Sequence, residues 1–389
     1  MENNTYYQKL LHERHADISL SGSILIIIGG MIGVIGNATI IFFYFFRIKE
    51  KSERYFIPLL ATVDLLGCIT SPVFFTLDNE YLYNYPSPIA CRILSFLQVF
   101  IPGISGHTLL LISIQRYILV CRPFGQKMTC FWKRFSCVIV CLVSIAYSIP
   151  LLITAGVDKE NITFLNKNVT TEMCKFTVYH TPSMDAYLIL LFVIMVANIF
   201  LTTCFYIPIL KHISVSLHFR TTQNEIQEKR HADPQEESSQ IAHTSESDQT
   251  SCSYQIKVLE KEKNLRDSMM VDFPTLKGSR DPSGTHKKKD LNHMKKKIGI
   301  RRSSSVQRRI TIMFFVLIVV YVISYTPPLV IIIRFNMLGN SMFLTMTQVE
   351  TGLWIYLGQM VILTHIINPL IYGLFDTKFR EKLRTSCLK

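Results

Sequence analysis

Polar side chains that could bind an ion or hydrogen-bond one another stand inside long apolar stretches of this sequence. They are Asn37, Asp64, Ser105, His365 and Asn368. An aspartate at the centre of a membrane-spanning helix costs about 2.5–3.5 kcal/mol on insertion scales, so such residues indicate a functional site. Asp64 is the one acid that lies securely inside an apolar stretch, so the sequence lacks the series of acids that pumps and channels place along a water path.

Other residues mark the ends and bends of the same stretches. Arg116-Tyr117 ends the third stretch, 25 positions after Cys91. Pro327 cannot donate a backbone hydrogen bond, so it frees a carbonyl and kinks its helix. The sequence holds no phosphate-binding loop, zinc-binding motif or nucleophile elbow, so we do not predict an enzyme.

Apolar blocks must position these residues. The chain has 389 residues, of which 49% are hydrophobic and 18% charged. The apolar residues fall into blocks of about 20 or more, the length that crosses a bilayer core. We predict helices at roughly 20–46, 55–77, 88–121, 133–154, 183–212, 303–335 and 350–374. The predicted fold is an all-α membrane protein, a seven-transmembrane helix bundle with a short amphipathic eighth helix.

The segments around the blocks complete the predicted organisation. Residues 1–19 are polar and predict an extracellular N-terminus, and 20–212 hold the first five transmembrane helices. Residues 213–302 are rich in Ser, Thr, Gln, Glu and Lys and predict a disordered cytoplasmic third loop. Residues 303–374 hold helices six and seven, and 375–389 predict an amphipathic helix and a cytoplasmic tail.

Charge sets the predicted orientation. Basic clusters follow the first, third and fifth blocks and fill the tail, at 47–54, 122–134, 287–302 and 378–384. The positive-inside rule places them in the cytoplasm. The net charge of +13 therefore reflects the inner leaflet of the lipid bilayer and partner-facing loops, and no nucleic acid is expected. Glycosylation sequons at Asn3, Asn161 and Asn168 fall on the extracellular side.

Most of the ten cysteines lie in predicted helices or on the reducing side, so they do not form a disulfide framework. Cys91, at the outer start of the third helix, and Cys174, in the second outer loop, share the oxidising side, and we predict that they pair. Cys387 follows the amphipathic tail helix and is either a palmitoylation site or a free thiol.

Taken in order, the motifs resemble those of one family. They are Gly36-Asn37, Leu60-Ala61 with Asp64, Arg116-Tyr117, and Asn368-Pro369 with Tyr372, each on its expected helix. The chain resembles rhodopsin-like (class A) G-protein-coupled receptors, most of all invertebrate-type neuropeptide receptors. The resemblance implies a plasma-membrane receptor that binds an extracellular ligand and activates heterotrimeric G proteins by outward movement of helix six.

The resemblance also implies a sodium site. In the family, an aspartate in the place of Asp64, a serine in the place of Ser105 and polar residues of helix seven hold Na⁺ in the inactive state. Here Thr364 and His365 stand where Asn and Ser are usual. A protonated His365 could form an ion pair with Asp64 that replaces the sodium, or a neutral His365 could hydrogen-bond the aspartate or a water. The sequence leaves both open, and no other cofactor is expected.

The resemblance assigns activation roles at the cytoplasmic half. Gln115 replaces the acid that usually restrains Arg116, and Gln307 stands where helix six often has an acid, so we predict elevated basal activity. Tyr206 and Tyr372 match water-bridged tyrosines, and Tyr325 matches an aromatic toggle. Helix five carries Asn198 in place of its usual proline.

Two residues exclude some classes of ligand. Ile362 stands where retinal-binding relatives have lysine, and Gln98 stands where amine receptors have aspartate, 18 positions before Arg116. A peptide ligand is favoured, with a pocket of Asp78, Gln98, Tyr325, Arg334 and Trp354. The alternatives are a non-peptide or orphan class A receptor with high basal activity and, from another class, a seven-helix ion transporter or channel. Measurements of ligand-gated ion currents in the absence of G protein would distinguish a transporter or channel from a receptor.

Regulation is predicted in the third loop. Ser303 and Ser304 follow Arg301-Arg302 and form a candidate kinase site at the base of helix six. A phosphate there adds about −1.5 to −2 charge. Serines among acids in the loop suit receptor kinases that recruit arrestin.

Overall fold

The computed structural model describes residues 2–48, 54–122, 125–178, 181–232, 308–331 and 346–387. Ser303, Ser304, Gln307 and Arg334, with most of the predicted third loop, lie outside the described residues. Of Asn3 and Cys387 only the backbone is described. The chain divides into two units, Met1–Ser214 with Ser304–Lys389, and Val215–Ser303. The first unit contains almost all of the described residues.

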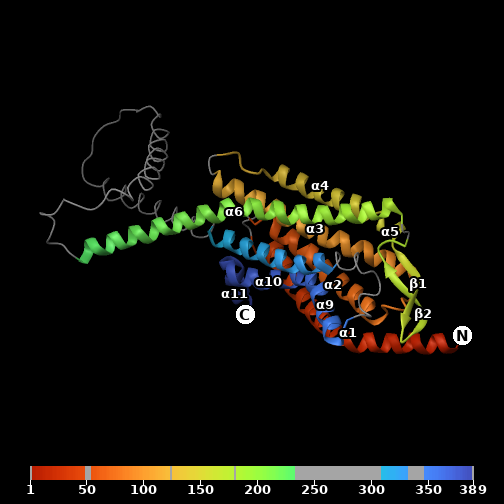
Figure 1. The fold of residues 1–389 in the computed structure, drawn as a ribbon. Coiled ribbons are helices and arrows are strands. Elements are labelled where there is room, and N and C mark those ends of the chain that lie inside the picture. Colours follow the sequence, from red (N-terminus) through yellow and green to blue (C-terminus); the bar gives the residue numbers. More distant parts are fainter. Residues whose placement is uncertain are drawn as a thin grey trace, which may run out of the picture. The chain divides into compact units, whose positions relative to one another are not determined.

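Within the described residues, seven helices are long and apolar enough to cross a membrane, as predicted. These spans are Tyr6–Arg47, Phe56–Glu80, Pro88–Cys121, Cys130–Thr154, Pro182–Val215, Arg308–Ile331 and Gln348–Phe375. Figure 1 shows them as a bundle of long helices. Each meets the length of about 20 residues that a bilayer core requires.

The labels of Figure 1 divide the spans into elements. They are α1 (Glu2–Phe42) with the π-helical turn η1 (Phe43–Arg47), α2 (Phe56–Glu80), α3 (Pro88–Cys121), α4 (Cys130–Ser148), the short α5 (Leu151–Thr154), α6 (Pro182–Ala232), α9 (Gln348–Gln359), the 3-10 turn η3 (Met360–Ile362) and α10 (Leu363–Phe375). The span Arg308–Ile331 is called the sixth helix. The short helix α11 (Thr377–Cys387) follows α10 and confirms the predicted eighth helix.

Local sequence starts several of these helices. Ser87 accepts a hydrogen bond from the Ala90 amide at 3.3 Å, and proline fills the first position of α3. Thr347 and Glu350 form a reciprocal capping box at the start of α9. These contacts satisfy backbone N–H groups that have no partner in the first helical turn.

A β-hairpin joins α5 to α6. Strands β1 (Gly156–Phe164) and β2 (Lys167–Lys175) pair antiparallel, with Phe164 opposite Lys167. Leu165 and Asn166 form the turn with φ of 49° and 59°. Two-residue hairpin turns of this kind need positive φ at both positions. The end of the bundle that carries this hairpin is called the hairpin end, and the opposite end is called the α11 end.

The first helix begins earlier than the predicted start near residue 20. Helix α1 begins at Glu2, so residues that the sequence assigns to the extracellular N-terminus extend the first membrane helix. Leu11 is buried in a cluster with apolar residues of the α2–α3 loop and the hairpin, namely Leu82, Tyr83, Ile162, Phe164, Val169 and Met173. The extension is stabilised by this tertiary packing, which a local reading of charge and polarity does not reveal.

The main apolar core lies between the helices toward the α11 end. Its buried members come from every span except α4, and include Ile57, Leu60, Leu109, Ile112, Ile209, Phe314, Leu317 and Ile371. Because lipid is as apolar as these side chains, close packing rather than exclusion from water holds such helices together. Buried polar residues of α2, α3 and α10 lie beside this core.

Candidate functional site

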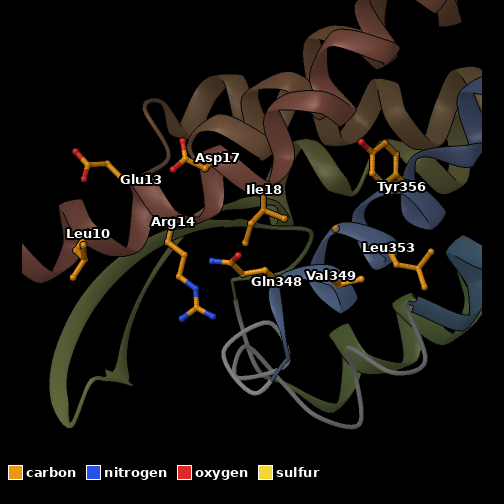
Figure 2. Close-up of a pocket in the computed structure, with 10 residues that line it drawn as sticks. Leu10, Glu13, Arg14, Asp17, Ile18, Gln348, Val349, Leu353 and Tyr356 are labelled. Carbon is orange, nitrogen blue, oxygen red and sulfur yellow. The ribbon is translucent and has the colours of Figure 1, made fainter.

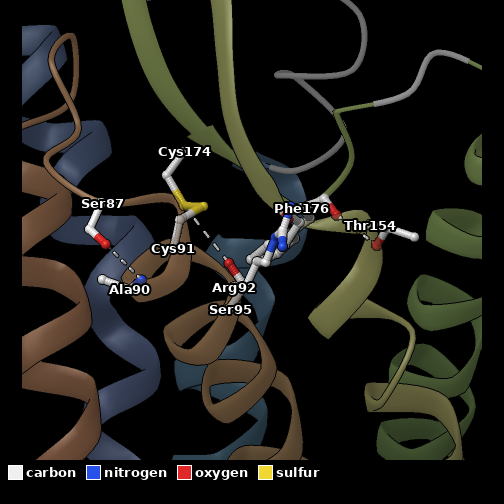
Figure 3. The surroundings of a disulfide bond; sticks show 9 residues. Ser87, Ala90, Cys91, Arg92, Ser95, Thr154, Cys174 and Phe176 are labelled. Atoms are coloured by element: carbon white, nitrogen blue, oxygen red, sulfur yellow. Dashed lines mark hydrogen bonds between the residues drawn. A yellow bond between two sulfur atoms is a disulfide. The ribbon is translucent and has the colours of Figure 1, made fainter.

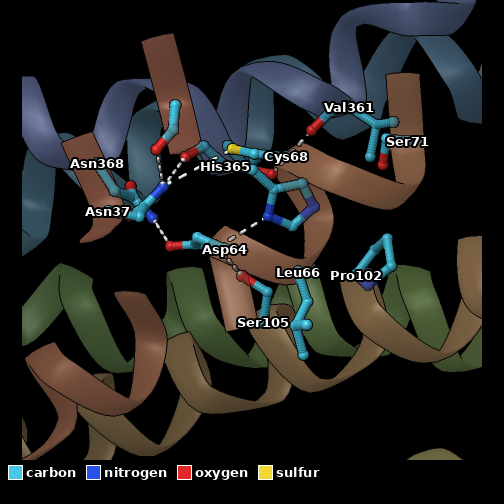
Figure 4. Close-up of polar contacts among 12 residues, drawn as sticks. Asn37, Asp64, Leu66, Cys68, Ser71, Pro102, Ser105, Val361, His365 and Asn368 are labelled. Carbon is cyan, nitrogen blue, oxygen red and sulfur yellow. Dashed lines mark hydrogen bonds and ion pairs between the residues drawn. The ribbon is translucent and has the colours of Figure 1, made fainter. Parts of the chain in front are cut away.

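Asp64 of α2 is the centre of a buried polar cluster (Figure 4). The Ser105 hydroxyl donates to its Oδ1 at 3.1 Å, and Nδ1 of His365 lies 2.8 Å from the same oxygen. The Asn368 side-chain amide donates to Oδ2. Both carboxylate oxygens are therefore bonded to protein, which offsets the cost of burying the acid.

Asn37 of α1 joins this cluster through the backbone of α10. Its amide Nδ2 donates to the carbonyl of His365 at 2.9 Å and to that of Gly33 at 3.0 Å. The cluster thus connects α1, α2, α3 and α10. Thr364 was also predicted for the polar core. Its hydroxyl donates to the carbonyl of Val361 at 2.8 Å instead of to Asp64.

The His365 ring fits because α2 has a glycine opposite it. A Cβ on Gly67 would lie 2.6 Å from Cδ2 of the imidazole and 2.8 Å from Nε2. The side chain of His365 is fully buried, so the ring occupies the space between α2 and α10. Pro369, one turn further along α10, packs against Gly36 in the same way, since a Cβ there would lie 2.7 Å from the proline.

The residues around Asp64 do not fit a sodium ion. Sodium requires oxygen lone pairs, as other hard cations do. Ser105 and Asn368 instead turn hydrogen-bond donors toward the carboxylate, and His365 presents a ring nitrogen to it. The imidazole also fills the space beside it.

Arg116 is buried at the α11 end of α3. Its guanidinium carbon lies 4.8 Å from the ring centre of Phe314 in the sixth helix. Gln115 is also buried, and the ring of Tyr117 lies edge-on to Phe205 of α6 at 5.7 Å. These contacts bring α3, α6 and the sixth helix together at this end of the bundle.

Two predicted tyrosines flank the same region. Tyr206 of α6 stacks on Phe315 of the sixth helix with ring centres 6.2 Å apart. Tyr206 and Tyr372 are both buried, and neither hydroxyl has a hydrogen-bond partner among the described residues. No direct bond between them is found in that part of the chain.

Asn198, the departure in the fifth span, has a partner that the sequence did not suggest. It accepts a hydrogen bond from the Tyr321 hydroxyl of the sixth helix at 2.8 Å. Gly106 of α3 leaves room for Tyr321, because a Cβ there would lie 2.8 Å from that hydroxyl. Asn198 and Tyr321 lie 123 positions apart in the sequence, so spacing gave no signal of this contact.

Tyr325 lies one turn beyond Tyr321, with ring centres 4.6 Å apart. Its hydroxyl donates to the carbonyl of Pro102 in α3 at 3.4 Å. The sixth helix continues through Pro327 to Ile331. Tyr325 thus links the sixth helix to α3.

The disulfide Cys91–Cys174 confirms the predicted pairing and ties α3 to β2 (Figure 3). Beside it, Nε of Arg92 donates to the carbonyl of Ala155 at 3.1 Å. The hydroxyl of Thr154 donates to the carbonyl of Phe176 at the same distance. The hairpin is therefore fixed to the bundle at both of its ends.

The residues predicted to form the ligand pocket lie in different parts of the structure. Gln98 accepts a hydrogen bond from Ser71 of α2 at 3.3 Å, so its amide lies between α2 and α3. Asp78 and Trp354 are half-buried near the hairpin-end turns of α2 and α9. Arg334 lies outside the described residues.

The residue next to Asp78 makes contacts that sequence reasoning missed. The Asn79 side-chain amide donates to Ser23 at 2.9 Å and accepts from Gln359 at 2.8 Å, and its carbonyl accepts from Ser19 at 3.1 Å. This second polar cluster joins α1, α2 and α9. Asn79 stands between Asp78 and Glu80, so the sequence gave no sign that its amide would be buried.

A groove of about 700 Å³ opens between the N-terminal part of α1 and α9 (Figure 2). Leu10, Glu13, Arg14, Asp17 and Ile18 of α1 line one side, and Gln348, Val349, Gly352, Leu353 and Tyr356 of α9 line the other. The sequence did not suggest this groove, because the first helix was predicted to begin near residue 20.

A buried ion pair anchors α11. Nε of Arg54 lies 2.7 Å from Oδ2 of Asp376, and the Tyr44 hydroxyl donates to the same oxygen at 2.6 Å. Oδ1 of Asp376 accepts from the Lys378 amide at 2.9 Å, which caps α11. The ring of Phe379 stacks on that of Tyr44, with centres 6.0 Å apart. An aspartate just before an amphipathic helix was the available sequence signal.

Comparison with known proteins agrees with this geometry. Residues 36–372 match the family described as "7 transmembrane receptor (rhodopsin family)". The chain therefore belongs to the rhodopsin family of seven-transmembrane receptors. It is a multi-pass membrane protein of a family whose members are signalling receptors and not enzymes.

Similar proteins include receptors of different kinds. Melanopsin-B of Gadus morhua is 32% identical over 193 residues, which cover 45% of this chain and 30% of melanopsin-B. Neuropeptide Y receptor type 6 of Mus musculus is 26% identical over 148 residues, covering 37% of this chain and 38% of that receptor. The matched stretches thus cover less than half of either relative.

The crystal structure of squid rhodopsin has a similar fold. Its TM-score with this chain is 0.58 at 16% identity, covering 94% of this chain and 84% of the squid chain. At this identity the likeness shows a shared fold and does not extend to the ligand.

Proposed function

We propose that the chain is a plasma-membrane receptor that binds an extracellular peptide at the hairpin end and activates heterotrimeric G proteins at the α11 end. Membership of the rhodopsin family supports the receptor part, and the likeness to a neuropeptide Y receptor supports the peptide part. The basic clusters after the first, third and fifth spans support an extracellular N-terminus and a cytoplasmic C-terminus.

The packing of Arg116 on Phe314 is the observation that carries the coupling half of the proposal. An outward movement of the sixth helix would separate the two side chains and uncover a buried guanidinium at the α11 end. Guanidinium groups in low-dielectric surroundings make strong hydrogen bonds to backbone carbonyls and carboxylates of a partner. The surface that this movement opens would receive the G protein.

The hairpin end supports a peptide ligand. The groove between α1 and α9 combines carboxylates of Glu13 and Asp17 with the guanidinium of Arg14. Leu10 and Leu353 add apolar surface. Peptides present charged and apolar side chains along one backbone, so a groove with both charge signs and apolar walls suits them better than a small uniform ligand.

A peptide-library screen on cells that report several G-protein pathways tests the proposal. We expect at least one peptide to signal through the wild-type receptor, with Arg116→Ala abolishing the response at equal surface expression. Arg122→Ala is the matched control, because Arg122 is an exposed arginine just beyond the same helix, and it should retain the response. Peptide-evoked currents without G-protein signalling would contradict the proposal and favour a channel.

Basal signalling tests the restraint on the sixth helix. Gln115, the neighbour of Arg116 in α3, is neutral and cannot supply the adjacent carboxylate that would restrain this arginine by a charge-assisted bond. We expect ligand-independent signalling above that of Arg116→Ala. Equal signalling by the two would contradict a loosely restrained receptor.

Covalent modifications belong to the proposed function on both sides of the membrane. Asn161 and Asn168 are exposed on the hairpin and are proposed as glycosylation sites. Palmitoylation of Cys387 would anchor the end of α11 to the bilayer. Phosphorylation of Ser303 and Ser304, which follow two arginines, would add negative charge at the base of the sixth helix and obstruct G-protein coupling.

A further inference from the structure

The contacts of Asp64 identify what holds this acid in the resting bundle. Its Oδ1 receives the Ser105 hydroxyl and lies 2.8 Å from Nδ1 of His365, and its Oδ2 receives the Asn368 amide. Whichever of the two groups carries the shared proton, the 2.8 Å contact engages Nδ1 of His365 with Asp64, so that nitrogen is not free to bind a cation.

The backbone fixes the imidazole in this position. Asn37 donates to the carbonyl of His365 at 2.9 Å, which restrains this turn of α10 against α1. Gly67 removes the side chain that would otherwise collide with the ring. The hydroxyl of Thr364 is bonded to Val361, so the neighbouring residue supplies no oxygen to the cluster.

We propose that His365 takes the place of a bound sodium ion beside Asp64, so that the polar core of this protein needs no cation. The imidazole bridges α2 and α10 through its contact with Asp64, and its buried ring occupies the space between these helices. The resting state would then be independent of sodium concentration. This consequence for signalling depends on the proposed receptor function, whereas the occupancy of the core does not.

Thermal unfolding of the purified, ligand-free protein tests the proposal without any signalling readout. Melting is compared in NaCl, KCl and choline chloride at one ionic strength. We expect the wild-type protein to melt at the same temperature in all three salts. We expect His365→Ser to gain a sodium-specific rise of about 2–4 °C when sodium exceeds its dissociation constant tenfold, because the smaller side chain opens space beside Asp64 and adds a hydroxyl oxygen.

Two further variants assign the effect. Asp64→Asn in the His365→Ser background should remove the gained sodium response. Thr364→Ser is the matched control and should behave as wild type, because its hydroxyl can keep the bond to Val361. If His365→Ser does not fold, His365→Asn serves in its place as a smaller side chain with an oxygen ligand.

Two results would overturn the proposal. One is a sodium-specific rise in the melting temperature of the wild-type protein that Asp64→Asn abolishes. The other is a folded His365→Ser variant that shows no sodium response, since some feature other than the imidazole would then exclude the ion. A failed peptide screen would leave either result unaffected, so this proposal and the proposed function can fail separately.

Discussion

The His365 ring and Gly67 depend on each other. The imidazole reaches Asp64 only because the facing residue of α2 has no side chain, and the ring cannot withdraw because it is fully buried. A methyl group at position 67 would force the ring or α2 to move. Interiors packed this closely transmit such strain to their surroundings.

Gly67→Ala should therefore destabilise the bundle, by about 1–3 kcal/mol as is typical of overpacking. Gly373→Ala in α10 is the matched control, because a Cβ there meets nothing within 4 Å. That control should be neutral or slightly stabilising. The melting temperatures of the purified variants provide the test, and His365→Ser should rescue Gly67→Ala if the ring is the cause.

For single residues, the sequence predicts which side chains matter better than it predicts which side chains they contact. Asp64, Ser105, His365 and Asn368 stand out because polar side chains in apolar helices are costly. The bond between Asn198 and Tyr321 could not be predicted, since it depends on how α6 and the sixth helix pack.

Among the elements, α11 is held by chemistry that is unusual for a surface helix. Arg54 and Asp376 are both buried, and the pair joins the start of α2 to the start of α11. Burial alone would raise the pKa of Asp376. The hydrogen bonds and charge of Arg54, with the Tyr44 hydroxyl, outweigh burial and hold that pKa below its usual range.

The attachment of α11 should accordingly be insensitive to pH until strongly acidic conditions. A carboxylate with a lowered folded pKa contributes stability above its unfolded pKa of about 3.9, and loses it as the pH falls through the lower folded value. Thermal stability should thus be unaffected by this group between about pH 5 and 8. A decline between pH 8 and 6 that Asp376→Asn removes would contradict this assignment.

Asp376→Asn should itself be costly at neutral pH. It leaves the buried Arg54 without its carboxylate, and removing one partner of a buried pair costs about 3–5 kcal/mol. Replacing both residues, as Arg54→Met with Asp376→Leu, should cost less than the single change. Melting temperatures of the single and double variants measure the difference.

The N-terminal extension of α1 is an element that depends on distant residues. Leu11 packs against the hairpin and the α2–α3 loop, and His15 lies edge-on to Tyr83 with ring centres 5.6 Å apart. Leu11→Ala should loosen this extension while the membrane spans remain folded. Hydrogen exchange should rise in the extension and in β1 and β2, whereas Tyr6→Ala, at an exposed position, should have little effect.

Membrane spans were predictable because each must present about 20 apolar residues in succession. The extension was not, because a helix of polar composition owes its stability to the surface it contacts. The hairpin falls between these cases. The outer loop that carries Cys174 is long enough for two strands, whereas the turn at Leu165 and Asn166 uses positive φ without glycine, so the local sequence gave little sign of it.

On the scale of the whole molecule, the disulfide closes a loop that contains most of α3, all of α4 and α5, and most of the hairpin. Cys91 and Cys174 are 83 positions apart. Disulfides typically contribute about 2–4 kcal/mol by restricting the unfolded chain. Cys91→Ala with Cys174→Ala should lower the melting temperature, and dithiothreitol should then have no further effect. Cys204→Ala, at an exposed free cysteine, is the control and should melt as wild type.

The two sequons of the hairpin face each other across its strands. The Thr170 hydroxyl donates to Oδ1 of Asn161 at 2.8 Å, and that of Thr163 donates to Oδ1 of Asn168 at 3.3 Å. Both side-chain nitrogens remain available for a sugar, on the face opposite to buried Ile162 and Val169. Carbohydrate attached there would cover the exposed face of the sheet and would not disturb the face that carries Ile162 and Val169. A glycosidase should therefore strip the hairpin bare without lowering the melting temperature, while giving antibodies and proteases access to strands that the sugar had shielded.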